Sequence, residues 1–337
     1  MTDLLLALLD DARHAPSVLN TQPWQFRLDG DAVLVLADRS RQLPALDPDG
    51  RELTISCGAA LAVLRVAARH RGLVARFDLL PDGDDADLLA RVTFEPLAAP
   101  DDDRLYRAIR LRRTHRRAFA GAPLPPDVAA DLAAAASTDG AWLHLLTSGS
   151  DRAAIAAVTE EAVEAQAQNP DVVADIRAWL RPDGDPRPDG VRDGDQGDGD
   201  RLATVRTSAA AVAAHKAALL RAAPAVAILG TDGDTPRQWL AAGIGLGTLL
   251  LVAADRGLAV SYANEAVEMG GPYRRRVAAL VGGGTPQIVI RVGQPADETG
   301  TPRRPLRDVA RVPPEASAPT GAEPLRVDSA SEDLIPL

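Results

Sequence analysis

The sequence of 337 residues has a single cysteine, Cys57, so no disulfide can form within one chain. This excludes the disulfide-rich secreted domains and favours a reducing compartment. The five histidines show no spacing typical of metal ligands, and we predict no metal site. No stretch reaches the roughly 18 uninterrupted apolar residues of a membrane span, and the apolar run at residues 4–9 is too short for a secretion signal. We therefore expect a cytoplasmic protein with no membrane partner.

Lysine is almost absent: Lys216 is the only one, and the other 36 basic residues are arginines. The net charge of −10 argues against non-specific binding to nucleic acid. Seven arginines nevertheless lie between residues 104 and 117, and this stretch contains no acidic residue. Because the planar guanidinium group binds phosphate oxygens in pairs, the cluster predicts one local anion site. A solvated basic helix face with acidic neighbours is the alternative.

The length exceeds what one hydrophobic core usually serves and predicts about two domains. Hydrophobic periodicity, Gly and Pro signals and capping residues predict an α+β protein. Asp49 is the expected N-cap of the helix that ends near His70, with Glu52 as its capping-box partner. Expected helices lie at 4–13, 50–70, 104–113, 127–136, 151–168, 170–180, 208–222 and 236–256, and expected strands at 24–28, 32–36, 74–79, 88–94, 141–147, 225–230, 259–262 and 287–292. Residues 181–200, nearly all Arg, Pro, Asp and Gly, predict a lid-like excursion.

An internal repeat with a constant offset of 185 residues links two of these helices. Gly58, Leu61, Leu64, Arg71, Gly72 and Leu73 recur as Gly243, Leu246, Leu249, Arg256, Gly257 and Leu258. One apolar helix followed by Gly-Leu and strands, occurring twice, predicts two similar halves packed together. Chance similarity between two helices rich in Ala and Leu is the alternative.

Two segments carry most of the functional information. Residues 15–24, APSVLNTQPW, form a proline-bounded loop whose short polar side chains can bind the hydrogen-bonding edge of a planar heterocycle. The same residues would also serve turn chemistry without any ligand. Residues 112–117, RRTHRR, end the basic helix.

These segments resemble the nitroreductase-like FMN-binding superfamily, and within it the Acg-type branch. The loop APSxxNxQPW, the phosphate motif Arg-Arg-Ser/Thr-x-Arg and a C-terminal basic pair before Pro-Leu are all present in order. The resemblance implies a nitroreductase-like fold and FMN as cofactor. It implies these cofactor-binding residues: Pro16, Ser17, Asn20, Gln22, Arg112, Arg113, Thr114, Arg116, Asn264, Glu265, Arg303 and Arg304. Thr301 stands where the family often has lysine.

The resemblance also implies which part of the FMN site each half of the chain supplies. In ordinary nitroreductases two chains of a homodimer share each FMN. Here the ring loop occurs only in residues 1–100, and the phosphate arginines occur only in residues 101–337. We therefore expect two fused halves, a pseudo-dimer that is a monomer or a homodimer, with one complete pocket between them.

By this resemblance the chain is an oxidoreductase: NAD(P)H reduces FMN by hydride transfer to its N5, and a small nitro- or quinone-like acceptor is reduced next. Since the flavin carries the chemistry, no side chain is nominated as catalytic. The alternative is a catalytically silent protein that stores FMN under the lid. A third hypothesis is an interaction protein whose arginines bind an acidic partner. The GIGLG run at 243–247 lies within a helix and does not predict a dinucleotide site.

Overall fold

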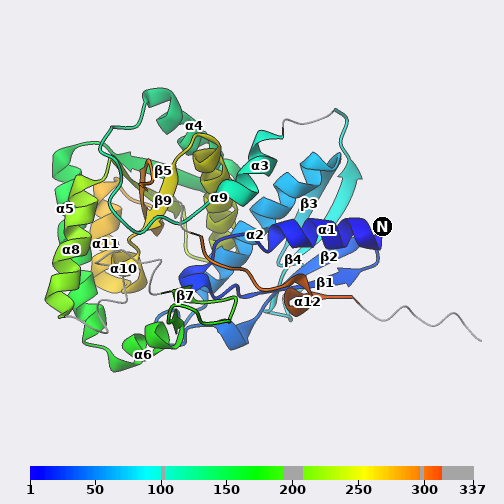
Figure 1. Cartoon of the computed structure of the whole chain (residues 1–337), viewed down its shortest axis with the longest axis horizontal. Helices are drawn as coiled ribbons and strands as arrows, with labels where there is room; N and C mark the ends of the chain where they lie inside the picture. Colours follow the sequence, from blue (N-terminus) through cyan, green and yellow to red (C-terminus); the bar gives the residue numbers. More distant parts are fainter. Residues whose placement is uncertain (100–102, 193–207, 297–299, 313–337) are drawn as a thin grey trace, which may run out of the picture.

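Two sheets form the framework of the protein, and their mixture with helices confirms the predicted α+β class (Figure 1). The computed structural model describes residues 1–99, 103–192, 208–296 and 300–312. The first sheet contains, in spatial order, β11 (Ala310–Arg311), β1 (Trp24–Asp29), β2 (Ala32–Ala37), β4 (Leu88–Pro96) and β3 (Leu73–Leu79). The second contains β5 (Ala141–Leu146), β8 (Ala225–Thr231), β10 (Thr285–Gly293) and β9 (Ala259–Tyr262). A separate parallel pair is β6 (Leu180–Arg181) with β7 (Val191–Arg192).

Helices pack on both sheets. They are α1 (Thr2–Ala12), α2 (Arg51–His70), α3 (Arg104–Leu111), α4 (Pro126–Ala136), α5 (Gly149–Ala167), α6 (Pro170–Ala178), α8 (Ala209–Ala222), α9 (Pro236–Asp255), α10 (Glu265–Glu268), α11 (Gly271–Leu280) and α12 (Leu306–Val309). Three short 3₁₀ turns are η1 (Val18–Asn20), η2 (Arg39–Arg41) and η3 (Thr138–Gly140). The short α12 and β11 bring the chain back beside β1, a return that the sequence did not predict.

The helices α2 and α9 contact each other at the centre of the molecule, and both their first and last residues are 185 positions apart. Gly58 and Gly243, separated by the same offset, lie against each other. A Cβ on Gly58 would overlap the carbonyl oxygen of Leu240, and one on Gly243 would overlap that of Ile55. These two partners are again 185 positions apart, so the contact is reciprocal, as at a two-fold axis between identical subunits.

Both helices are long and apolar enough to cross a membrane, judged by length and composition within the described residues. In α2, however, 83% of the apolar window is buried in the protein, and in α9 the share is 67%. Their apolar surface is therefore used by the core between the two sheets.

The two sheets repeat one topology. In the first, the chain runs β1, β2, α2, β3, β4 and the spatial order is first, second, fourth, third. In the second, the chain runs β5, β8, α9, β9, β10 with the same spatial order. The second unit carries an insertion from α5 to α8 between its first two strands. The predicted boundary at residue 100 stays a prediction.

One local expectation is wrong: Asp49 does not cap α2. The N-cap is Gly50, with a φ of 72°, and the carboxylate of Asp47 accepts hydrogen bonds from the backbone N–H groups of Glu52 and Leu53 at 3.0 and 2.9 Å. Asp47 can reach both donors because the chain turns sharply at the left-handed glycine. As a result, the side chain of Glu52 is not used for capping and points elsewhere.

Candidate functional site

The loop between α1 and β1 is held in a conformation that few residues adopt readily. Leu19, Asn20 and Gln22 have φ values of 44°, 54° and 51°. The hydroxyl of Ser17 accepts a hydrogen bond from the backbone N–H of Gln22 at 2.8 Å, and Trp24 is fully buried where β1 begins. Left-handed backbone at non-glycine positions is unfavourable and persists where surrounding contacts impose it, often at ligand sites.

Asn20 joins three parts of the chain that are distant in sequence. Its amide nitrogen donates to the carbonyl oxygens of Gly190 at 3.0 Å and Pro302 at 3.2 Å. Its amide oxygen accepts from the guanidinium of Arg303 at 3.1 Å. The amide is thus fully engaged with protein groups, and it positions the walls of the site.

Gln22 makes a second connection of this kind. Its amide nitrogen donates to the carbonyl oxygen of Pro188 at 2.9 Å, and its amide oxygen accepts from the backbone N–H of Arg304 at 2.8 Å. The guanidinium of Arg304 bonds in turn to the carbonyl oxygens of Gln22 and Asp308. Gln22 and Arg304 therefore fix the C-terminal segment to the loop.

The arginine motif lies along the open edge of the second sheet. Arg112 follows the last residue of α3, and Thr114 forms a parallel bridge with Val260 of β9. The backbone N–H of His115 donates to the carbonyl oxygen of Val260 at 3.0 Å. Because β9 is an edge strand with unpaired backbone groups, it can fix the motif in an extended path.

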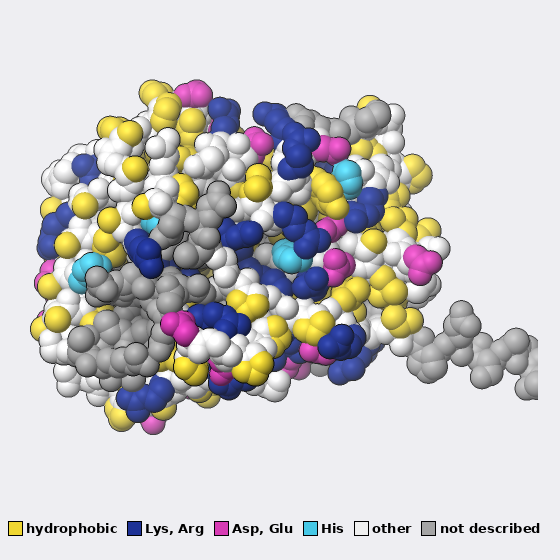
Figure 2. All heavy atoms as spheres, in the orientation of Figure 1, with side chains coloured by type: hydrophobic (Ala, Val, Ile, Leu, Met, Phe, Trp, Pro, Cys, Tyr) yellow, Lys and Arg dark blue, Asp and Glu magenta, His cyan; other side chains and the backbone are white. Residues whose placement is uncertain are grey.

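These segments enclose two adjoining pockets. The larger holds about 970 Å³ of space, part of it open to solvent, and the smaller about 360 Å³. Thr114, Arg116, Thr301 and Arg303 line both, so the two are continuous. Figure 2 shows basic side chains gathered in the middle of the face onto which this region opens.

Nine of the twelve predicted site residues line these pockets. Pro16, Ser17, Asn20 and Asn264 line the larger pocket; Arg112 and Arg113 line the smaller; Thr114, Arg116 and Arg303 line both. Gln22, Arg304 and Glu265 line neither. The loop and the arginines, about 100 residues apart in sequence, are thus brought to one site.

The smaller pocket concentrates positive charge. Arg112 is only 6% exposed, and its Nε and one Nη have no hydrogen-bond partner within the described residues; the same holds for the Nε of Arg303. Burial lowers the pKa of Arg112, and burial together with the charges of Arg112 and Arg113 lowers that of Arg303 well below its usual range. Of the described residues lining this pocket, none is acidic. Buried cations with open donors are suited to a bound anion.

His14 lines the same pocket and adds no charge at neutral pH. Burial, followed by the charges of Arg110, Arg13 and Arg303, lowers the pKa of His14 to about 3. The imidazole is therefore neutral and can offer one N–H donor.

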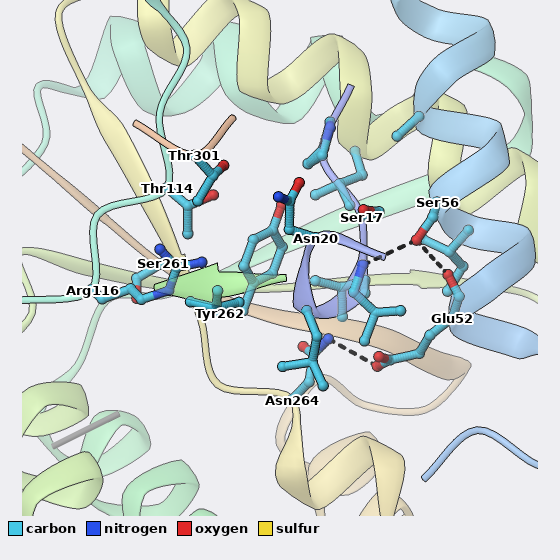
Figure 3. A pocket seen from close by; sticks show the side chains of 18 of the residues that line it. Ser17, Asn20, Glu52, Ser56, Thr114, Arg116, Ser261, Tyr262, Asn264 and Thr301 are labelled. Atoms are coloured by element: carbon cyan, nitrogen blue, oxygen red, sulfur yellow. Dashed lines mark hydrogen bonds between the residues drawn. The ribbon is translucent and has the colours of Figure 1, made fainter. Parts of the chain in front are cut away.

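The larger pocket has a different polar wall, where the two halves meet (Figure 3). The carboxylate of Glu52 accepts from the amide nitrogen of Asn264 at 3.1 Å and lies 3.3 Å from the guanidinium of Arg51. The amide oxygen of Asn264 accepts from the backbone N–H of Val289 at 2.9 Å. Since this bond fixes the amide, Asn264 holds Glu52 as a buried negative group in the wall.

Glu265, next to Asn264, faces another part of the molecule. Its carboxylate forms a buried ion pair with the ammonium of Lys216, the sole lysine. Its side chain lies with those of Gln166 and Val163 between α5, α6 and α8. The buried ion pair locates Glu265 in the packing of the insertion.

The described part of the predicted lid, residues 181–192, covers the larger pocket. Val191 and the preceding Leu180 line it directly. Asp189 pairs with Arg181 at 2.8 Å and with Arg41 at 3.1 Å. Burial alone would raise the pKa of Asp189, but the hydrogen bonds from both arginines outweigh it and lower the pKa. The ion pair with Arg41 therefore attaches this segment to the first half, and the pair with Arg181 lies within the segment. Residues 193–200 lie outside the described residues.

Several lining residues were not predicted from the sequence. The polar ones are His14, Glu52, Ser56, Ser261, Tyr262 and Thr301. Glu52 was interpreted as a capping residue, and residues 259–262 were predicted only as a strand. A signal did exist for Glu52, since charged residues in an otherwise apolar helix are almost never buried without a reason.

Known proteins support one family for this chain. "Putative NAD(P)H nitroreductase Rv3131" of Mycobacterium tuberculosis is 34% identical over 307 residues, which cover 89% of this chain and 88% of that protein. "Putative NAD(P)H nitroreductase acg" of the same organism is 29% identical over 326 residues, 92% of this chain and 96% of that protein. "Uncharacterized protein Rv3127", also of M. tuberculosis, is 30% identical over 325 residues, 89% of this chain and 91% of that protein. No family model matches the chain.

Among solved structures, the FMN and NADPH-dependent nitroreductase NfnB of Sphigopyxis sp. strain HMH is 19% identical and covers 61% of this chain and 96% of its own, with a TM-score of 0.39. Structural similarity at this level is too weak to support an argument. The sequence relatives span nearly the whole chain. The loop, the arginine motif and the C-terminal pair are all present in this chain. The chain belongs to the nitroreductase-like superfamily.

Proposed function

We propose that this protein binds one FMN per chain and is an NAD(P)H-dependent oxidoreductase. The observation that carries the proposal is the set of buried, unpartnered guanidinium donors in the smaller pocket. An FMN phosphate supplies the negative charge and acceptor oxygens that Arg112 and Arg303 lack. The adjoining larger pocket, with mixed apolar and polar walls, fits a planar ring system. When bound, FMN supplies the redox chemistry: it takes a hydride from NAD(P)H and passes electrons to a small nitro- or quinone-like acceptor.

The chain's own residues bind, orient and exclude water. Arg112, Arg113 and Arg303 hold the phosphate end. Glu52 and Asn264 form a rigid polar wall, and Leu180 with Val191 cover the larger pocket with apolar surface. No side chain needs to act as acid or base in this scheme.

The test is the absorption spectrum of the purified protein before and after NADPH or NADH. We expect a flavin spectrum with one FMN per chain, and rapid bleaching on mixing with at least one of the two reductants. A colourless protein that fails to bind added FMN would exclude the proposal. The third hypothesis, a protein that uses its arginines to bind an acidic partner, would then be favoured.

The segment over the larger pocket supports a second candidate, a protein that stores FMN without turnover. Asp189 pairs with Arg181 inside this segment and with Arg41 in the first part of the chain. Replacing Asp189 with Asn removes both ion pairs, which should cost about 3 kcal/mol in the order of the segment and its attachment through Arg41. Asp185→Asn is a matched control, because Asp185 pairs with Arg187 of the same segment.

The two candidates differ in their reduction rates. If FMN is stored, wild-type protein and Asp185→Asn bleach slowly with NADPH while Asp189→Asn bleaches several-fold faster. If the protein is an enzyme, wild type already bleaches rapidly. Slow bleaching in all three proteins, with FMN bound, would show that this segment does not control access.

The remaining assignments are part of the same proposal. We propose an Acg-type protein whose repeated sheets form a pseudo-dimer, present as a monomer or a homodimer in the cytoplasm. The reciprocal contact of α2 with α9 and the shared strand order support the two halves. Small-molecule acceptors and NAD(P)H are its proposed partners; nucleic acid and membranes are not.

A further inference from the structure

Tyr262 is a polar residue of the larger pocket whose hydroxyl group lacks a partner. It is the last residue of β9, and its ring packs against the core of the second half. The hydroxyl is buried and has no hydrogen bond to any described residue. In Figure 3 the ring stands between the side with Arg116 and Thr114 and the side with Glu52 and Ser56.

The charges that act on the hydroxyl are mostly positive. Burial raises the pKa of Tyr262, the neighbouring Arg112, Arg116 and Arg303 act in the opposite direction, and Glu52 adds a smaller effect that raises it. Arg112 lines the smaller pocket, and the other two line both pockets. The hydroxyl therefore lies near the junction of the pockets, close to Arg112 and Arg303, whose open donors were described above.

Packing alone does not account for this hydroxyl. A phenylalanine would fill the same apolar space, whereas a buried O–H without a partner loses its hydrogen bond to water and is destabilising. An anionic acceptor at the junction would remove that penalty and use the arginine donors at the same time.

We propose that Tyr262 is a cofactor-binding residue whose hydroxyl donates a hydrogen bond to the phosphate group of a flavin mononucleotide. The inference rests on the proposed function and adds to it a residue outside the arginine motifs. The acceptor is the phosphate because three of the four charged groups that act on the hydroxyl, Arg112, Arg116 and Arg303, are cationic. Tyr262 would thus help to distinguish FMN from riboflavin, which has the same ring and ribityl chain but no phosphate.

The experiment compares Tyr262→Phe with wild type in titrations of the apoprotein with FMN and with riboflavin, followed by flavin fluorescence. Tyr106→Phe is the matched control: Tyr106 stacks on His70 and lines neither pocket. We expect the Kd for FMN to rise about tenfold or more in Tyr262→Phe, and the Kd for riboflavin to change less than about twofold. Tyr106→Phe should bind both flavins as wild type does.

The outcomes separate the inference from the proposed function. Wild-type protein that binds no FMN overturns both. Wild type that binds FMN, with equal affinity in Tyr262→Phe, overturns the inference alone. An equal loss for FMN and riboflavin also overturns it, because the hydroxyl would then act on the ribityl chain. Unfolding of the apoprotein variants by urea checks that the Tyr262→Phe fold is intact, which we expect since the ring is retained.

Discussion

Replacing Arg112 with Met tests the anion site most directly, because it should stabilise the apoprotein but weaken the binding of FMN. The guanidinium is nearly buried, two of its nitrogens have no hydrogen-bond partner in the described part of the chain, and burial lowers its pKa. The folded state therefore disfavours a charge that the unfolded chain exposes to water. Methionine keeps the length and apolar stem of the side chain and removes the charge.

The expected changes in free energy differ between the apoprotein and the FMN complex. In the apoprotein, removing an uncompensated buried charge should raise the free energy of unfolding by about 1 kcal/mol. In the FMN complex, losing charge-assisted hydrogen bonds should cost about 1.5–3 kcal/mol of binding, or roughly 10- to 150-fold in Kd. At a concentration of about 100 times the wild-type Kd, FMN stabilises wild type by about 2.7 kcal/mol. With a Kd raised about 30-fold, the same concentration stabilises the variant by only about 0.9 kcal/mol. The order of stability should therefore reverse when FMN is added.

The assay is urea unfolding of both proteins with and without FMN, together with a fluorescence titration. Arg107→Met is the control, since Arg107 belongs to the same basic helix, is exposed and lines neither pocket. It should change neither stability nor Kd by a measurable amount. An Arg112→Met apoprotein that is less stable than wild type, with an FMN affinity within about threefold of it, would refute the reasoning, since Arg112 would then be a structural residue.

Two further substitutions test the fold around the site. Gly243→Ala should destabilise the protein by about 1–3 kcal/mol in urea, because its Cβ would overlap α2, whereas Gly149→Ala, with no atom within 4 Å, should be nearly neutral. Normal stability of Gly243→Ala would contradict the close approach of α2 and α9. Glu265→Gln removes the carboxylate that pairs with buried Lys216 and should cost about 3 kcal/mol of stability while the Kd for FMN stays unchanged. Lost FMN binding in a stable Glu265→Gln protein would instead support Glu265 as a cofactor ligand.

The helices could be predicted well where local signals decide them. Thr235 and Gln238 form the expected capping box of α9, and Asn169 caps α6 directly before Pro170. The N-terminus of α2 was mispredicted because two aspartates compete for the same donors. Which one caps the helix depends on the turn at Gly50, a tertiary choice that the motif does not contain.

The sequence predicted which segments form the site better than it predicted what each side chain contacts there. Motifs located the loop and the arginines, and the structure brings both to one pair of pockets. The hydrogen-bond partners of the motif side chains could not be predicted from the sequence. The amides of Asn20 and Gln22 bond to backbone groups of residues 188–190 and 302–304. Such contacts join residues 166–282 positions apart, and nothing in local spacing encodes them. Tyr262 was missed for the same reason: the sequence predicted a strand at 259–262 but not the partners of its side chains.

The proposed fusion of two halves in one chain leads to a last prediction, which concerns protein concentration. In this chain the ring loop and the phosphate arginines belong to one molecule, and the bonds from Asn20 to Gly190 and from Gln22 to Arg304 that shape the site are all within the chain. A site shared between two chains loses affinity when dilution separates them. Here the Kd for FMN should stay constant over about a thousandfold range of protein concentration, measured by fluorescence titration with the oligomeric state followed by sedimentation. If the affinity falls as a dimer dissociates, a second copy completes the site. If the Kd stays constant while a dimer dissociates, the dimer is not needed for FMN binding. The proposed fusion would then explain how each half could keep only one of the two motifs, the ring loop or the phosphate arginines.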